Sequence, residues 1–163
     1  MKRGDAWWLL PLAGLIILAG RESYNTVTGK NQYLDLARKY GARYNVPAAL
    51  IMAVIETESS FNPNAYRYEE KRQDASYGLM QVLYSTARGL GYSGTPQGLL
   101  DPETNINYGT AQLAWLYNQL AAGDWEPVIE AYNEGLGNYL GGIEDATYFA
   151  RVQLRWEKWK LIA

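Results

Sequence analysis

Residues 48–63 read AALIMAVIETESSFNP, and this stretch decides the fold. Pro47 suits the first turn of a helix, where its missing N–H costs nothing, and Pro63 limits any continuation. The sequence therefore predicts a helix that begins near Pro47 and ends at about Ser59. Successive residues are about 100° apart around a helix axis, so the apolar residues of this segment form a stripe centred near Ile51.

Glu58 lies on that stripe, about 20° from Ile51, whereas Glu56 lies about 140° away and is predicted to face solvent. An acid on an apolar stripe loses hydration, which penalises its charged form and raises its pKa. The C-terminal end of the helix acts in the same direction, because it disfavours negative charge. An acid with a raised pKa can donate a proton at neutral pH. Geometry alone leaves two alternatives open, in which Glu58 curls out to solvent or pairs with a nearby arginine.

The chain of 163 residues contains no histidine and no cysteine. Zinc sites built on these residues, serine–histidine–aspartate triads and cysteine nucleophiles are therefore excluded. The net charge of −2 provides no basic footprint, so we expect no nucleic-acid partner. The 14 Tyr and 6 Trp suit grooves that are apolar on one side and wet on the other, as sugar-binding grooves are, although such rings also fill ordinary cores.

The length and the 48% apolar fraction predict one globular domain, and the patterning makes it mostly α-helical. Besides the helix that ends near Ser59, helical spacing and capping signals predict helices from residue 31, over 78–88, over 101–123, over 124–132 and from residue 144. The charged segment 66–74 is predicted to be exposed. A short hairpin near Tyr66 to Tyr77 is the one candidate for β-structure.

Residues 1–20 resemble a secretory signal or a membrane anchor, because Lys2 and Arg3 precede an apolar run from Ala6 to Gly20. The run is shorter than the roughly 20 residues that a membrane-spanning helix needs. A buried N-terminal helix of the fold is a third interpretation. Arg21 stands where a lipidated cysteine would be, which excludes a lipid anchor. Residues 21–30 are predicted to be a polar tether to a domain over 31–163.

Three short motifs follow one another in this domain. Residues 53–65 read AVIETESSFNPNA, residues 78–81 read GLMQ and residues 131–135 read AYNEG. They resemble the Glu-Ser, Gly-Leu-Met-Gln and Ala-Tyr-Asn-Ala-Gly motifs of soluble-type lytic transglycosylases, and residues 148–152 are similar to the helix that closes that domain. Each motif alone is weak, whereas the ordered set is specific. The resemblance implies a lysozyme-like single helical domain of the goose-lysozyme type.

The resemblance also implies roles for individual residues. Glu58 is implied to be the catalytic acid. The residues implied to support it or to bind substrate are Ser59, Gly78, Met80, Gln81, Tyr132, Asn133 and Tyr148. Ser59 would support the turn, Gln81 and the Met80 backbone would lie near the substrate, and Tyr148 is the weaker candidate for the wall formed by Tyr132 and Asn133. No metal and no cofactor are implied.

The implied reaction cuts the glycan strand of peptidoglycan between N-acetylmuramic acid and N-acetylglucosamine without consuming water. Glu58 would protonate the linking oxygen, the substrate's N-acetyl group would support the positive centre, and Glu58 would then accept the proton of the C6 hydroxyl to leave a 1,6-anhydro end. A lysozyme-type hydrolase is an alternative, with Asp74 or Asp101 as a second acid. A non-catalytic wall-binding component of a phage particle or secretion machine is another.

The expected location is the periplasm or the outer face of the cytoplasmic membrane, with the N-terminal segment as the membrane contact. The alternative is a phage virion component that is delivered to the periplasm. The sequence departs from the family pattern at 74–77, in the charged loop 67–72 and at Glu134, which replaces a small residue. These departures concern the outer cleft and leave the acid in place.

Overall fold

The computed structural model describes residues 29–163. The chain divides into two units, residues 1–32 and 33–163, and the second contains the sheet and every helix from α2 onward. The predicted signal or anchor and most of the predicted tether lie outside the described residues. Residues 29 and 30, which the sequence assigns to the tether, already belong to a helix over 29–44. Within residues 29–163, no helix is both long and apolar enough to cross a membrane.

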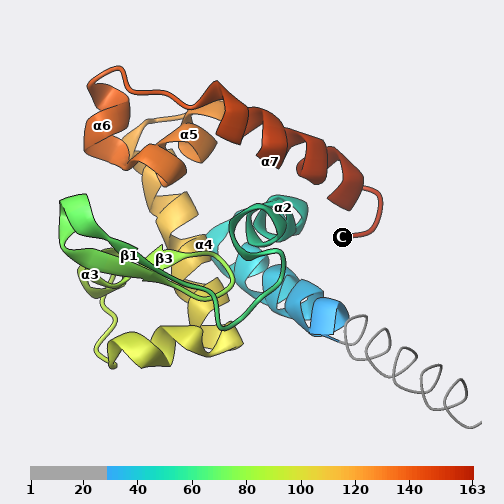
Figure 1. Cartoon of the computed structure of the whole chain (residues 1–163). Helices are drawn as coiled ribbons and strands as arrows, with labels where there is room; N and C mark the ends of the chain where they lie inside the picture. Colours follow the sequence, from blue (N-terminus) through green and yellow to red (C-terminus); the bar gives the residue numbers. More distant parts are fainter. Residues whose placement is uncertain (1–28) are drawn as a thin grey trace, which may run out of the picture. The chain divides into compact units, whose positions relative to one another are not determined.

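The described unit is mostly helical, as predicted. After the helix over 29–44, the α-helices are α2 (Ala48–Ser59), α3 (Tyr84–Gly89), α4 (Pro102–Gln119), α5 (Glu126–Glu134), α6 (Leu136–Leu140) and α7 (Ala146–Trp159). Short 3-10 helices lie at η2 (Glu70–Arg72) and η3 (Pro96–Leu100). Strands β1 (Tyr66–Glu69), β2 (Asp74–Tyr77) and β3 (Val82–Leu83) form an antiparallel sheet in the order β1-β2-β3. Figure 1 shows α7 running beside α2.

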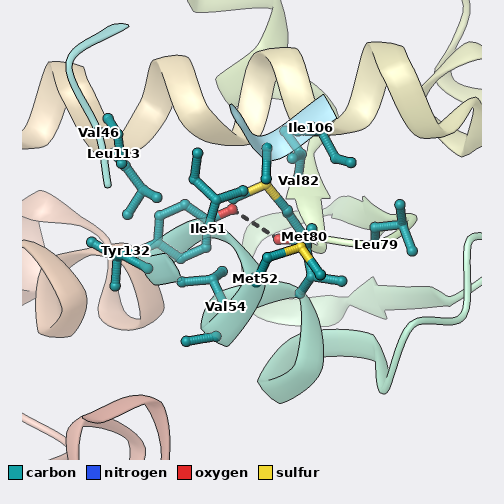
Figure 2. Close-up of a cluster of buried hydrophobic side chains, with 14 of the residues drawn as sticks. Val46, Ile51, Met52, Val54, Leu79, Met80, Val82, Ile106, Leu113 and Tyr132 are labelled. Atoms are coloured by element: carbon teal, nitrogen blue, oxygen red, sulfur yellow. Dashed lines mark hydrogen bonds between the residues drawn. The ribbon is translucent and has the colours of Figure 1, made fainter. Parts of the chain in front are cut away.

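Helix α2 forms the centre of the core. Every residue from Ala49 to Ile55 is buried, because this part of the helix carries no polar side chain and is covered on all sides. Figure 2 shows Ile51, Met52 and Val54 among side chains from the segment after β2 and from α4, including Leu113. Fully burying one such aliphatic side chain contributes about 1.5–3 kcal/mol, so the element that carries Glu58 is firmly held.

The hairpin predicted near Tyr66 to Tyr77 is confirmed, with Tyr66 opposite Tyr77 across β1 and β2. The helix predicted over 78–88 is wrong in its first half. Gly78 and Gln81 have positive φ angles of 71° and 47°, which an α-helix does not allow, and they form a tight turn into β3. Helical structure begins only at Tyr84.

The other predicted helices begin within two residues of their expected starts, although the predicted cap Asp124 is not the N-cap of α5. Asp101 accepts a hydrogen bond from the Thr104 amide at 2.8 Å, and Pro102 occupies the first turn of α4. The helix ends at Gln119, four residues before the predicted stop at Gly123. Helix α7 begins just after Asp145, whose side chain accepts hydrogen bonds from two backbone amides. Helix α6 was not predicted, because five residues with one glycine give too short a pattern.

Candidate active site

Glu58 lies in the last turn of α2, where the helix leaves the core. The backbone then turns sharply, because Ser60 and Phe61 both adopt left-handed conformations with φ of 51° and 67°. Ser59 donates its hydroxyl to the Ile55 carbonyl at 3.1 Å, which supports this turn in the way that its position suggested. The Glu58 side chain is half-buried and faces a pocket instead of bulk solvent.

Tyr148 of α7 is the hydrogen-bond partner of Glu58. Its hydroxyl donates to Oε1 of Glu58 at 2.6 Å, and both the ring and the hydroxyl are buried. The guanidinium of Arg151 lies 5.7 Å from the centre of the Tyr148 ring. The tyrosine that the sequence ranked lowest among the substrate-wall candidates therefore contacts the acid directly.

The environment of Glu58 raises the pKa of its carboxyl. Burial is the main cause, and the negative charge of Glu69 adds to it. The hydrogen bond from Tyr148 and the positive charges of Arg67 and Arg151 act in the opposite direction without overcoming burial. The raised pKa agrees with the helical-wheel argument and keeps a larger fraction of this carboxyl protonated near neutral pH, as a general acid requires.

Glu56 has the opposite surroundings, and its predicted exposure to solvent is wrong. Lys158 Nζ lies 2.7 Å from both carboxylate oxygens of Glu56, and the indole N–H of Trp159 donates to Oε2, also at 2.7 Å. Burial would raise the pKa of Glu56, but these donors outweigh it and lower the pKa. The helical wheel placed Glu56 on the correct side of α2 but gave no sign that α7 covers that side.

The turn at residues 78–81 is held by Asn105 of α4. The buried Asn105 amide donates to the carbonyls of Tyr77 and Leu99, both at 2.7 Å, and its oxygen accepts the Met80 amide at 2.7 Å. A Cβ atom on Gly78 would lie 2.5 Å from the Asn105 amide nitrogen, so only glycine fits this close approach. Asn105 holds this turn in place, and its role was not predicted. A single asparagine in a helix does not indicate which remote backbone groups it binds.

Met80 and Gln81 take different positions at this turn. The Met80 side chain is fully buried in the core (Figure 2), and its carbonyl accepts the Tyr132 hydroxyl at 2.8 Å. Gln81 reaches the pocket, and its amide also donates to the Gly78 carbonyl at 3.0 Å. Of the GLMQ residues, Gln81 is therefore the one whose side chain is placed to meet a ligand.

Tyr132 and Asn133, at the end of α5, form a second wall of the pocket. The Tyr132 hydroxyl is fixed by its bond to Met80, and burial together with the nearby charge of Glu58 raises its pKa well above the usual range. Asn133 donates its side-chain amide to the Glu134 carboxylate at 3.0 Å. The phenol therefore stays protonated and acts only as a fixed polar group.

The pocket has a volume of about 220 Å³ and joins segments far apart in the sequence. It is lined by Glu58, Arg67, Glu69, Arg72, Ser76, Gln81, Leu83, Thr86, Gln112, Trp115, Leu116, Ala131, Tyr132, Asn133, Gly135 and Leu136. Four of the eight predicted site residues line it. Tyr148 contacts the lining residue Glu58, and Ser59 bonds the Ile55 carbonyl within α2. Gly78 and Met80 act through backbone geometry.

Several lining residues were not predicted. Trp115 of α4 is 42% exposed and lines the pocket, which leaves its ring available for a ligand. Glu69 accepts Nε–H of Arg67 at 2.6 Å and the Ser76 hydroxyl at 3.3 Å, so a second carboxylate faces the same pocket as Glu58. The charge of the 66–74 segment was noted in the sequence, but its place beside the acid depends on the hairpin.

The two acids proposed as alternative partners have structural roles instead. Asp74 accepts hydrogen bonds from the backbone amides of Ala75 and Ser85, and Asp101 caps α4. Neither is among the residues that line the pocket.

Comparison with known proteins then decides the family. The transglycosylase SLT domain family matches residues 35–149. The chain belongs to this family. The motifs at 53–65, 78–81 and 131–135 all fall within the matched range.

Solved structures agree with this assignment. The 70-kDa soluble lytic transglycosylase from Escherichia coli is 31% identical, with a TM-score of 0.55, over 77% of this chain and 22% of that chain. A complex of the 70-kDa soluble lytic transglycosylase with bulgecin A is 33% identical, with a TM-score of 0.55, over 72% and 20%. An inactive mutant of the lytic transglycosylase Slt from Pseudomonas aeruginosa, 23% identical with a TM-score of 0.58, shows likeness of fold alone. The chain spans about a fifth of the length of these proteins.

Proposed function

We propose that this protein is a peptidoglycan lytic transglycosylase that uses Glu58 as its single catalytic acid and base. The observation that carries the proposal is the half-buried Glu58 carboxyl, with its raised pKa and its Tyr148 hydrogen bond, at the surface of a pocket lined by sugar-compatible side chains. Membership of the SLT domain family and likeness to lytic transglycosylases support the substrate class.

The proposed reaction follows from what these groups can do. Protonated Glu58 gives its proton to the oxygen that links N-acetylmuramic acid to the next sugar, and the linking bond breaks. The N-acetyl oxygen of the substrate supports the positive centre at C1. The Glu58 carboxylate then accepts the proton of the C6 hydroxyl as that oxygen bonds to C1. The products are a free 4-hydroxyl and a 1,6-anhydro end, and the acid returns to its starting state.

Substrate contacts are assigned to three sides of the pocket. Gln81 offers amide donors and acceptors for sugar hydroxyls, and Asn133 offers the same from α5. The exposed ring of Trp115 suits the apolar face of a sugar. We further propose that the enzyme works outside the cytoplasmic membrane, where this substrate lies. The roles suggested for residues 1–20, for a phage particle and for a secretion machine stay predictions from the sequence.

A lysozyme-type hydrolase is the second candidate, and Glu69 is the observation that favours it. Hydrolysis needs a group that positions water, and the Glu69 carboxylate lines the same pocket as Glu58. Its ion pair with Arg67, at 2.6 Å, holds this carboxylate on the hairpin wall of the pocket. Asp74 and Asp101 no longer serve as candidates for this role, because both cap backbone amides elsewhere.

One experiment separates these functions. The chain is incubated with purified peptidoglycan, and the soluble fragments are analysed by mass spectrometry, with Glu58→Gln as the inactive control. Fragments with anhydro ends, lighter by one water than hydrolysis products, are expected. Reducing ends that disappear in Glu69→Gln would instead establish the hydrolase. Because a relative was solved with bulgecin A, binding of bulgecin A provides a test of the pocket that does not depend on activity.

A further inference from the structure

The loop end of the β1–β2 hairpin is connected to the opposite wall of the pocket by Arg72. This residue ends η2, and its guanidinium Nη2 donates to the Glu134 carbonyl at 2.7 Å. Glu134 is the last residue of α5, and its carbonyl also accepts the side-chain amide of Asn138 at 3.0 Å. Figure 1 shows the loop end of the hairpin on the side where α5 and α6 lie. Sheet and helices are thus joined across the site by one side chain.

The backbone opposite Arg72 is shaped to receive it. Gly135 has a φ of 82°, a left-handed conformation that side chains rarely adopt. A Cβ atom there would lie 3.2 Å from Nη2 and 3.7 Å from Nη1 of Arg72. Glycine suits this position because of its backbone conformation, and a larger residue would also crowd the guanidinium that lies over the α5–α6 junction.

The Arg72–Glu134 hydrogen bond, which we call the bridge, lies at the pocket of Glu58. Arg72 and Gly135 both line that pocket, from the hairpin wall and from the α5–α6 wall respectively. Arg67 and Glu69 lie on the same hairpin wall, so the bridge continues a charged edge. The pocket is therefore bounded at this edge by a hairpin side chain that is hydrogen-bonded to the α5–α6 wall.

The bridge is a single hydrogen bond that a bound polymer can break. Within residues 29–163, no carboxylate is ion-paired with Arg72, and its cross-pocket partner is a neutral carbonyl. Arg72 is also exposed, so water can replace this partner. A polymer can therefore displace the arginine, but a strand that ends before the bridge does not have to.

We propose that Arg72 is a specificity-determining residue that favours cuts near the end of a glycan strand over cuts within it. This inference rests on the proposed transglycosylase function. A long strand can enter an open groove anywhere along its length, whereas a bridged groove admits an interior segment only after the Arg72–Glu134 hydrogen bond breaks. Short glycans and strand ends occupy the site next to Glu58 without this step.

The test compares Arg72→Ala with Lys71→Ala. Lys71 is the preceding residue of η2, is exposed, and makes no hydrogen bond or ion pair within the described residues, so it controls for loss of one positive charge. The length of the first fragments released from intact peptidoglycan is measured by chromatography and mass spectrometry, beside the rate on a soluble tetrasaccharide. We expect Arg72→Ala to raise the ratio of long to disaccharide fragments at least threefold over Lys71→Ala, with the tetrasaccharide rate used to normalise the activity of each variant.

A second measurement reports on the bridge itself. Hydrogen exchange of the backbone amides over 134–140 is expected to be several-fold faster in Arg72→Ala than in Lys71→Ala, because the junction loses a contact. Equal exchange would overturn the bridge, and equal fragment lengths in the two variants would overturn its role in specificity. A wild-type chain that releases no anhydro fragments would instead contradict the proposed function on which this inference rests.

Discussion

Helix α7 contacts two glutamates near the end of α2, Glu58 and Glu56, and gives them different hydrogen-bond partners. Near its start, Tyr148 gives one neutral donor to Glu58. Near its end, Lys158 and Trp159 give Glu56 a positive charge and a second N–H donor. The pKa of Glu58 is raised and that of Glu56 is lowered, although only one residue separates them. Burial acts to raise the pKa of both carboxyls, and the difference teaches that the donors supplied by α7 overcome it at Glu56 but not at Glu58.

The largest expected effect is the loss of cutting in Glu58→Gln. An amide of the same shape cannot donate or accept the reacting proton, so we expect the rate of anhydro fragment release to fall by about 10³-fold. Glu56→Gln is the matched control and should stay within about threefold of wild type. Circular dichroism checks that both variants are folded. Substantial cutting by Glu58→Gln, or an equal loss in both variants, would contradict the comparison.

The next effect concerns Tyr148→Phe. The Tyr148 hydrogen bond favours the charged form of Glu58, so its removal should raise the pKa of Glu58 further. Because the acid must be protonated, the alkaline limb of the pH profile of kcat/KM should move to higher pH. We also expect about a tenfold lower maximum, since the carboxyl loses the donor that orients it. An alkaline limb at the same pH as in wild type would show that the Tyr148 hydroxyl does not influence the pKa of Glu58 and that Tyr148 contributes only packing.

Glu56→Gln should affect stability where Glu58→Gln affects activity. Its ion pair is partly exposed, so we expect a loss of about 1 kcal/mol in the free energy of unfolding at pH 7, measured in urea. The folded-state pKa of Glu56 lies below its unfolded value, so this stabilisation is present above the unfolded pKa and is lost as the pH falls through the folded pKa. The difference in the free energy of unfolding between wild type and Glu56→Gln should therefore become smaller at acidic pH. A constant gap would contradict the charge-based explanation.

The smallest effect is a gain of stability in Glu58→Gln. The folded-state pKa of Glu58 is raised, so the folded protein binds more protons than the unfolded chain between the two pKa values, and stability falls as the pH rises through that interval. The variant does not titrate there and should be more stable than wild type by about 0.5 kcal/mol at pH 8. The advantage should shrink below about pH 4. A variant that is less stable at pH 8 would show that the carboxylate is not under a burial penalty.

Sequence patterns predicted those features that depend on residues close together in the chain, such as helix faces and helix starts. The period of α2 placed Glu58 with the apolar stripe, and Asp101 with Pro102 identified the start of α4, because helix faces and caps are set within a few residues. Patterns failed where the partner is remote. Lys158 lies 102 residues after Glu56, and Asn105 lies 25 residues after the Met80 amide that it binds. The family motifs located Gln81 and Tyr132, but not Arg72 or Trp115, which reach the pocket only through tertiary structure.

Asn105 gives the site a property that no motif contains. One buried amide joins α4 to both sides of the Gly78 turn and to η3, so three segments share a single point of attachment. The carbonyl that orients Tyr132 belongs to the residue whose amide Asn105 holds. A shift of α4 would therefore also displace Tyr132 at the wall of the pocket. The pocket is an extension of the protein's interior, and its activity should report on the integrity of the core.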